Sequence, residues 1–157
     1  MKHSHEIPLG KLFSQLTKEY VGTFTKRLEN LPITRHFYPL VLIAEAEGKL
    51  SQTCLAHELN MDKVSVVRLV DYLSEHGCVV RKQNPADRRE QLLQCTKLGE
   101  SYIPDIQKAM IETNELSLEG LNSEEVKILE KMLSKVTCNL RHQPQDTYNI
   151  EFIKKDK

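Results

Sequence analysis

Residues 51–96 read SQTCLAHELNMDKVSVVRLVDYLSEHGCVVRKQNPADRREQLLQCT, and the fold class can be inferred from this segment. Ser51 opens a short helical pattern that ends near Asn60, a residue type that tolerates the left-handed conformation of a helix C-terminus. Asp62 can cap a second helix that lasts to about His76. The inward positions are Leu55, Ala56 and Leu59 in the first helix and Val66, Leu69, Val70 and Leu73 in the second. Two short helices joined by a tight turn predict a helix-turn-helix.

After Gly77 the hydrophobic period changes from that of a helix to that of a strand. Strand-forming side chains at residues 78–80 and 92–95 flank the segment NPADRRE, residues 84–90, which has the composition of a turn. A strand, a charged turn and a strand directly after a helix-turn-helix indicate a wing. We therefore expect a winged helix-turn-helix over residues 49–98, in a mainly α fold with a small β-hairpin (α+β).

Longer helical patterns flank this core. Leu9–Leu28 carries an apolar and aromatic stripe, and further patterns cover about residues 96–118 and 122–140. These stripes offer more apolar surface than one small domain buries, so they need a partner, either the rest of the chain or a second copy. The expected division is residues 1–48 as N-terminal dimerisation helices, 49–98 as the winged unit, 99–142 as C-terminal dimerisation helices and 143–157 as an extended arm.

The start of one helix is open between two alternatives. Thr34 can N-cap a helix that runs to about Glu47 and is ended by Gly48, but Pro39 lies inside that span. The helix either kinks at Pro39 or begins there, with proline at its first position.

The composition is that of an ordinary globular protein, with 39% hydrophobic and 28% charged residues. The chain has no apolar run long enough for a transmembrane helix, and its first residues lack the apolar core of a secretory signal. We expect a cytoplasmic protein with no membrane partner. Although the net charge is zero, residues 49–98 carry 8 basic and 6 acidic side chains (8 − 6 = +2), so a mild basic excess falls on the expected winged unit.

The outward face of the second helix is the candidate DNA-reading surface, because such a helix enters the major groove with its N-terminal half. Arg68 can chelate guanine N7 and O6, Ser65 can meet a base edge or a phosphate, and Lys63 suits a phosphate. Val64 and Val67 would pack against thymine methyl groups; the alternative is that one of them completes the core. The expected contacts are thus Lys63, Val64, Ser65, Val67 and Arg68.

The turn of the wing holds Asp87, Arg88 and Arg89. Two adjacent arginines at a loop tip suit the narrow minor groove, where negative potential is focused. Asp87 is expected to hold one arginine by a charge-assisted bond and so fix the hairpin. A basic turn in isolation is more often a solvated loop, but its place directly after a helix-turn-helix favours contact with DNA.

The ordered string from Leu55 to Glu100 resembles the MarR family of bacterial transcriptional regulators. The run MDKVSVVRLVDYLSEHG resembles the recognition helix of that family, NPADRR its wing, and CTKLGE its strand-to-helix junction. The segments ITRHFYPLVLI and LNSEEVKILEKML are weaker matches to its second and last helices. The resemblance covers about residues 9–140 and departs from the family at Val64 and Val67, where Ser or Thr is common.

The resemblance implies an obligate homodimer on palindromic double-stranded DNA. It also implies a repressor that releases DNA when a small aromatic or phenolic effector binds, or when a cysteine is oxidised. Candidates for an effector pocket are Tyr20, Phe24, Phe37 and Tyr38, with core or dimer packing as the alternative. Cys54 is the candidate redox thiol, although its place beside Leu55 and Ala56 favours a buried, inert side chain.

Other chemistry finds little support. Cys54 with His57, and His3 with His5, are each only part of a metal site, so no metal and no cofactor are expected. No nucleophile elbow, phosphate loop or HExxH motif is present, so we do not expect an enzyme. The remaining alternative is a winged-helix module that binds protein rather than DNA, which would have no need of Arg68, Arg88 and Arg89.

Overall fold

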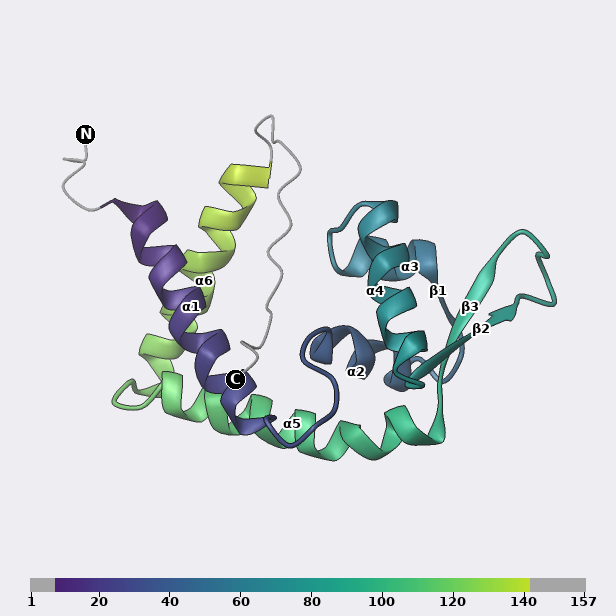
Figure 1. The fold of residues 1–157 in the computed structure, drawn as a ribbon. Helices are drawn as coiled ribbons and strands as arrows, with labels where there is room; N and C mark the ends of the chain where they lie inside the picture. Colours follow the sequence, from purple (N-terminus) through teal and green to yellow (C-terminus); the bar gives the residue numbers. More distant parts are fainter. Residues whose placement is uncertain (1–7, 142–157) are drawn as a thin grey trace.

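The computed structural model describes residues 8–141, which form six helices and one three-stranded sheet. In chain order they are α1 (Leu9–Arg27), α2 (Phe37–Glu45), β1 (Leu50–Ser51), α3 (Gln52–Glu58), α4 (Lys63–Glu75), β2 (Val79–Gln83), β3 (Gln91–Cys95), α5 (Lys97–Ser117) and α6 (Ser123–Arg141). The long α5 runs along one side of the molecule, with α1 and α6 at one of its ends and the winged unit at the other (Figure 1). The expected winged-helix fold is confirmed.

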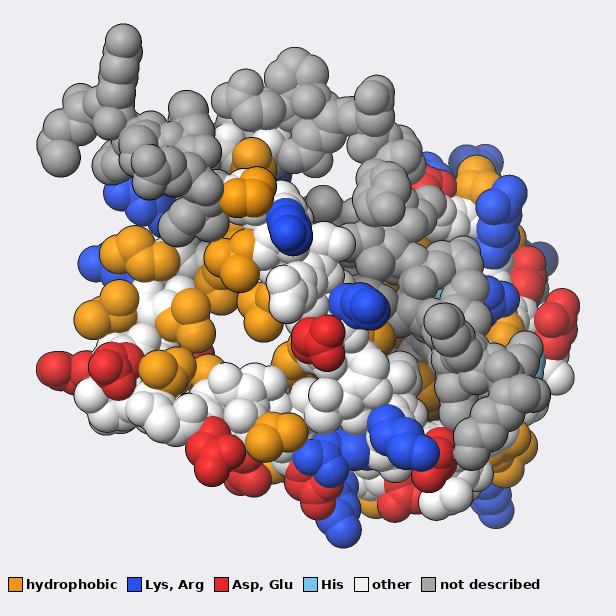
Figure 2. All heavy atoms as spheres, turned by 60° about the vertical axis from the view of Figure 1, so that its left-hand side comes forward, with side chains coloured by type: hydrophobic (Ala, Val, Ile, Leu, Met, Phe, Trp, Pro, Cys, Tyr) orange, Lys and Arg blue, Asp and Glu red, His pale blue; other side chains and the backbone are white. Residues whose placement is uncertain are grey.

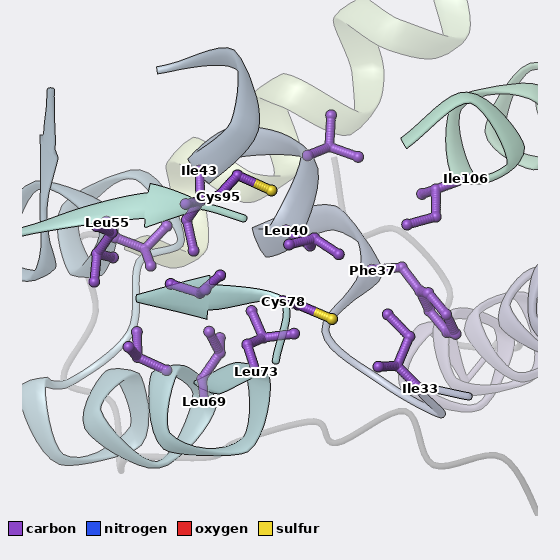
Figure 3. Packing of buried hydrophobic residues seen from close by; sticks show 14 of the residues in the cluster. Ile33, Phe37, Leu40, Ile43, Leu55, Leu69, Leu73, Cys78, Cys95 and Ile106 are labelled. Atoms are coloured by element: carbon purple, nitrogen blue, oxygen red, sulfur yellow. The ribbon is translucent and has the colours of Figure 1, made fainter. Parts of the chain in front are cut away.

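Caps and a buried stripe hold the helix-turn-helix, α3 and α4. The Ser51 hydroxyl accepts a hydrogen bond from Cys54 N at 3.2 Å, and Asp62 Oδ1 accepts one from Ser65 N at 2.9 Å. Between the helices Asn60 has a φ of 50°, the left-handed conformation expected of it. The stripe of α4 that faces the core is Val66, Leu69, Val70 and Leu73, as predicted. Figure 3 shows Leu69 and Leu73 pointing from α4 toward the strands.

The wing is an antiparallel hairpin in which Val79 pairs with Cys95 and Gln83 pairs with Gln91. A third strand, β1, pairs with β3 on its other side, which makes the order β1-β3-β2. The sequence did not predict β1, because two residues are too few to show an alternating pattern.

Both alternatives for the start of α2 are wrong. The helix begins at Phe37, two residues before Pro39, and its N-cap is His36 with a φ of 63° rather than Thr34. The first hydrogen bond of the helix runs from Leu40 N to His36 O, at 3.1 Å. Pro39 therefore lies in the first turn, where its missing N–H removes no helical hydrogen bond.

A close backbone contact joins the wing to α5. Thr96 N donates to Cys78 O at 2.9 Å, and Thr96 Oγ1 donates to Gly77 O at 2.7 Å. A Cβ atom on Gly99 would lie 2.4 Å from Cys78 O and 2.7 Å from Cys95 Sγ. Only glycine lets α5 start this close to the strands, so residue 99 sets how the winged unit meets the long helix.

The extended arm expected at residues 143–157 and the His3 and His5 pair lie outside residues 8–141. Within that range no helix is both long enough and apolar enough to cross a lipid bilayer.

Gly99→Ala should lower the free energy of unfolding by about 1–3 kcal/mol, the usual cost of overpacking a rigid site. Denaturant unfolding monitored by circular dichroism measures this loss. Gly10→Ala is the matched control, because a Cβ there meets nothing within 4 Å. A Gly99→Ala protein that unfolds at the wild-type denaturant concentration would show that the close contact does not constrain the junction.

Candidate functional site

The outward face of α4 carries two apolar side chains among basic ones. Val64 is 61% exposed and Val67 is 42% exposed, while Lys63 and Arg68 beside them are also exposed. The alternative that one of the valines completes the core is therefore wrong for this chain. Exposed valines on a surface that also carries cations suit a partner with both methyl groups and negative charge, which duplex DNA presents in its major groove.

Ser65 differs from its neighbours on α4. It is half-buried, and its hydroxyl donates to Asp62 Oδ2 at 2.7 Å while its backbone N–H donates to Asp62 Oδ1. The side chain thus helps to cap its own helix. Its hydroxyl proton is therefore already used in a hydrogen bond within the protein, so the Ser65 side chain could meet DNA only as an acceptor.

Backbone and amide hydrogen bonds hold the tip of the wing and leave both arginine side chains at the surface. Asp87 Oδ1 accepts from Arg89 N at 2.9 Å, and Gln83 Nε2 donates to Arg88 O at 3.0 Å. Asp87 does fix the turn as expected, but through the backbone N–H of Arg89 rather than through a guanidinium group. Arg88 and Arg89 are exposed, so their charges are available to a partner.

Arg81 on β2 connects the wing to both helices of the helix-turn-helix. Its Nε donates to Gln52 Oε1 at 2.9 Å, and its NH2 group donates to Asp71 Oδ1 at 2.7 Å. The sequence pattern did not single out this residue. The role of Arg81 could have been predicted from its position two residues after the buried Val79. Alternate residues of a strand share a face, and an arginine on the inner face needs a hydrogen-bond acceptor.

On α4, Tyr72 anchors the segment that precedes α2. Thr34 N donates to its phenolic oxygen at 2.8 Å, and the Arg35 guanidinium lies 4.5 Å from the centre of its ring. The ring of His36 packs edge-on against Tyr72 at 5.3 Å. Burial, together with the positive charge of Arg35, lowers the pKa of His36 to about 4. The His36 imidazole is therefore neutral at neutral pH.

The four aromatic residues expected in an effector pocket do not all meet. Phe24 and Phe37 pack edge to face with 5.6 Å between ring centres, and Phe37 is buried. Tyr20 donates to Asn114 Oδ1 at 2.6 Å, and burial raises the pKa of its hydroxyl. Tyr38 is exposed. The Phe24–Phe37 pair therefore belongs to the packing between α1 and α2.

Two of the four cysteines are exposed and two are buried. Cys54 and Cys138 are exposed, so the expectation of a buried Cys54 is wrong. Each helical residue is rotated by about 100° from the last, so a neighbour of Leu55 need not face inward. Burial raises the pKa of Cys78, and burial with the nearby Glu100 raises that of Cys95 to about 11, which makes both thiols poor nucleophiles. Residues 8–141 contain no cluster of three potential metal ligands.

A second surface lies at the other end of the molecule. Neither α1 nor α6 has a buried residue in the single chain. Figure 2, turned toward that end, shows apolar side chains gathered around a hollow. The exposed apolar residues there are Leu9, Leu12 and Leu16 of α1, Ile111 and Leu116 of α5, and Ile128, Leu129, Met132, Leu133 and Leu140 of α6. An apolar area of this extent is typical of an interface with another protein chain.

Comparison with known proteins agrees with this geometry. A sequence model described as MarR family matches residues 30–90, from the loop before α2 to the turn of the wing. A solved structure of MarR is 28% identical, with a TM-score of 0.69 over 90% of this chain and 98% of that one. A mutant MarR from E. coli complexed with operator DNA is 26% identical, with a TM-score of 0.74 over 83% and 94% of the two chains. The transcriptional regulator SlyA shares the fold at 21% identity, with a TM-score of 0.76 over 85% and 94%.

Proposed function

We propose that this chain is a winged-helix transcriptional regulator of the MarR family, which binds duplex DNA in a sequence-specific way. The observation that carries the proposal is that the N-terminal half of α4 and the tip of the wing both present exposed basic side chains on one winged unit. The N-terminal half of α4 fits the major groove, and the wing tip with Arg88 and Arg89 fits the adjacent minor groove.

The charge distribution supports this mode of binding. The Asp87 carboxylate accepts a hydrogen bond within the turn. The wing therefore presents two guanidinium groups to the phosphates and the minor groove of a duplex. Asp62, the acidic residue at the start of α4, is likewise occupied as a helix cap. The acidic groups nearest the proposed contacts are therefore engaged within the protein.

Arg68→Ala and Arg89→Ala should both weaken binding, in distinguishable ways. Loss of a bidentate contact at Arg68 should cost about 1–3 kcal/mol and relax the base preference at one position. Loss of Arg89 should weaken binding while preserving the preference in the major groove. Anisotropy titrations at fixed salt, on a duplex taken from beside the coding sequence of the protein, measure both effects. Arg141→Ala, an exposed arginine at the end of α6, is the control and should bind like wild type.

If Arg68→Ala and Arg89→Ala both bound that duplex as tightly as wild type, neither α4 nor the wing would contribute to binding. Binding that is tight but identical for unrelated duplexes would limit the protein to nonspecific attraction to phosphates.

The exposed valines define the expected base preference. We propose that Val64 and Val67 pack against thymine C5-methyl groups in the major groove. Relatives with Ser or Thr at these positions would contact other groups on the base edges. The DNA sequence that this protein prefers should therefore differ from the one that they prefer.

Replacing the contacted thymines by deoxyuridine removes only their methyl groups. Each buried methyl group lost should weaken binding by about 0.8 kcal/mol, roughly fourfold in Kd. A Val64→Ser, Val67→Ser double variant should no longer distinguish the two duplexes. Equal wild-type affinity for the thymine and uracil duplexes would contradict a methyl contact.

We further propose that the apolar faces of α1 and α6 join two copies of the chain as a homodimer. A two-fold dimer presents two recognition helices and two wings, which matches a palindromic site of two half-sites. The support is the absence of any buried residue on α1 and α6 in the single chain, together with the apolar surface they share.

Light scattering at micromolar concentration should give about twice the chain mass of 18.1 kDa. Leu133→Glu, which places a charge on the apolar face of α6, should shift the mass toward the monomer. Lys131→Glu is the control, because residue 131 lies on the other side of the same helix. A monomeric wild type would overturn the proposed dimer.

The proposed regulatory role is repression that a signal relieves. Support for a small aromatic signal comes from the solved BpsR of Bordetella bronchiseptica, described by regulation of its DNA binding by 6-hydroxynicotinic acid; it is 19% identical, with a TM-score of 0.73. Tyr20 and Phe24 on α1, facing α5 and α2, are the residues through which such a ligand would act here. The exposed Cys54 on α3 is the thiol through which an oxidant would act.

A further inference from the structure

Arg81 occupies a position where the wing, α3 and α4 meet. It belongs to β2, where it pairs with Leu93 of β3, and its side chain extends to the first residue of α3 and to the middle of α4. A third and longer contact, 3.5 Å, joins its NH2 group to Val67 O. One side chain therefore adds hydrogen bonds that link three elements of the winged unit.

The guanidinium group fixes an angle as well as a distance. Its donors lie in one rigid plane, so the bonds to Gln52 and Asp71 together orient β2 relative to both helices. The Arg81 side chain is only 25% exposed, so it is largely shielded from water. A lysine could keep the charge but could not hold both acceptors in this geometry.

Asp71 lies on the surface of α4 that is proposed to face DNA. Residues 64, 67 and 71 are spaced by three and four positions, so Asp71 continues the row of exposed valines by one turn. An unpaired carboxylate in this row would repel phosphates. The bond from Arg81 neutralises that charge and uses it to hold the wing.

We propose that Arg81 is a positioning residue that sets the orientation of the wing relative to α4, so that both can contact one DNA duplex at the same time. The proposal rests on the proposed DNA binding and deepens it. Arg81 acts through Asp71 and Gln52 on the placement of the wing-tip arginines, without touching DNA itself.

The competing role is a direct phosphate contact by Arg81, and Asp71→Asn separates the two. This change removes a negative charge from the DNA-facing row, so electrostatics alone predicts tighter binding. The positioning role predicts binding weaker by roughly tenfold, the scale of one lost charge-assisted hydrogen bond. Gln52→Ala, which changes no charge, should weaken binding in the same direction. Arg81→Lys, which keeps the positive charge, should also bind the duplex more weakly than wild type.

A double-mutant cycle with Arg89→Ala tests whether the effect passes through the wing. If Asp71→Asn misplaces the wing, part of the contribution of Arg89 is already lost, and the two changes together should weaken binding by less than the product of their separate effects. Hydrogen exchange of the DNA-free protein should be faster for the amides of β2 and β3 in Asp71→Asn, while those of α5 keep the wild-type rate.

The inference fails if Asp71→Asn binds the duplex as tightly as wild type or more tightly, or if its effect multiplies fully with that of Arg89→Ala. It also fails if Arg81→Lys binds like wild type. A wild-type protein that binds no duplex specifically would instead overturn the proposed function, so the two failures are distinguishable.

Discussion

One buried stripe of α4 holds the winged unit together and orients its exposed face. Val66, Leu69, Val70 and Leu73 are all within 1% of complete burial. Because a helix that buries one face must present the opposite one, this stripe alone decides that Val64, Val67 and Arg68 face outward. The strands pack against the same core, so the wing leaves the molecule beside the exposed face of α4. The candidate site is thus a consequence of packing.

The sequence predicted most of this arrangement, because its signals are local and strong. Caps at Ser51 and Asp62, the left-handed Asn60 and the change of period after Gly77 each act within a few residues. What it missed depends on distant partners. β1 exists only because β3 lies beside it, α2 begins where His36 adopts a left-handed conformation against Tyr72, and Arg81 finds its acceptors on two other elements.

The two ends of the molecule have complementary tasks in the proposed function. At one end, α1 and α6 expose apolar faces that a second copy would cover; at the other, α4 and the wing expose cations and methyl-sized side chains. The long α5 connects them, and its first turn is fitted against the wing strands through Gly99. In the proposed dimer, a change in how the two subunits pack would therefore be transmitted through α5 and would alter the distance between the two recognition helices. In that dimer, this connection would let a signal near α1 alter DNA binding.

Methylation interference on the bound operator can show which grooves the protein contacts, because it reports guanine N7 in the major groove and adenine N3 in the minor groove in one experiment. We predict two sets of major-groove guanine interference about one helical turn apart, each with adenine interference in the neighbouring minor groove. Interference confined to one groove, or a single set without a symmetric partner, would show that the protein does not bind DNA as two subunits that each use a helix and a wing.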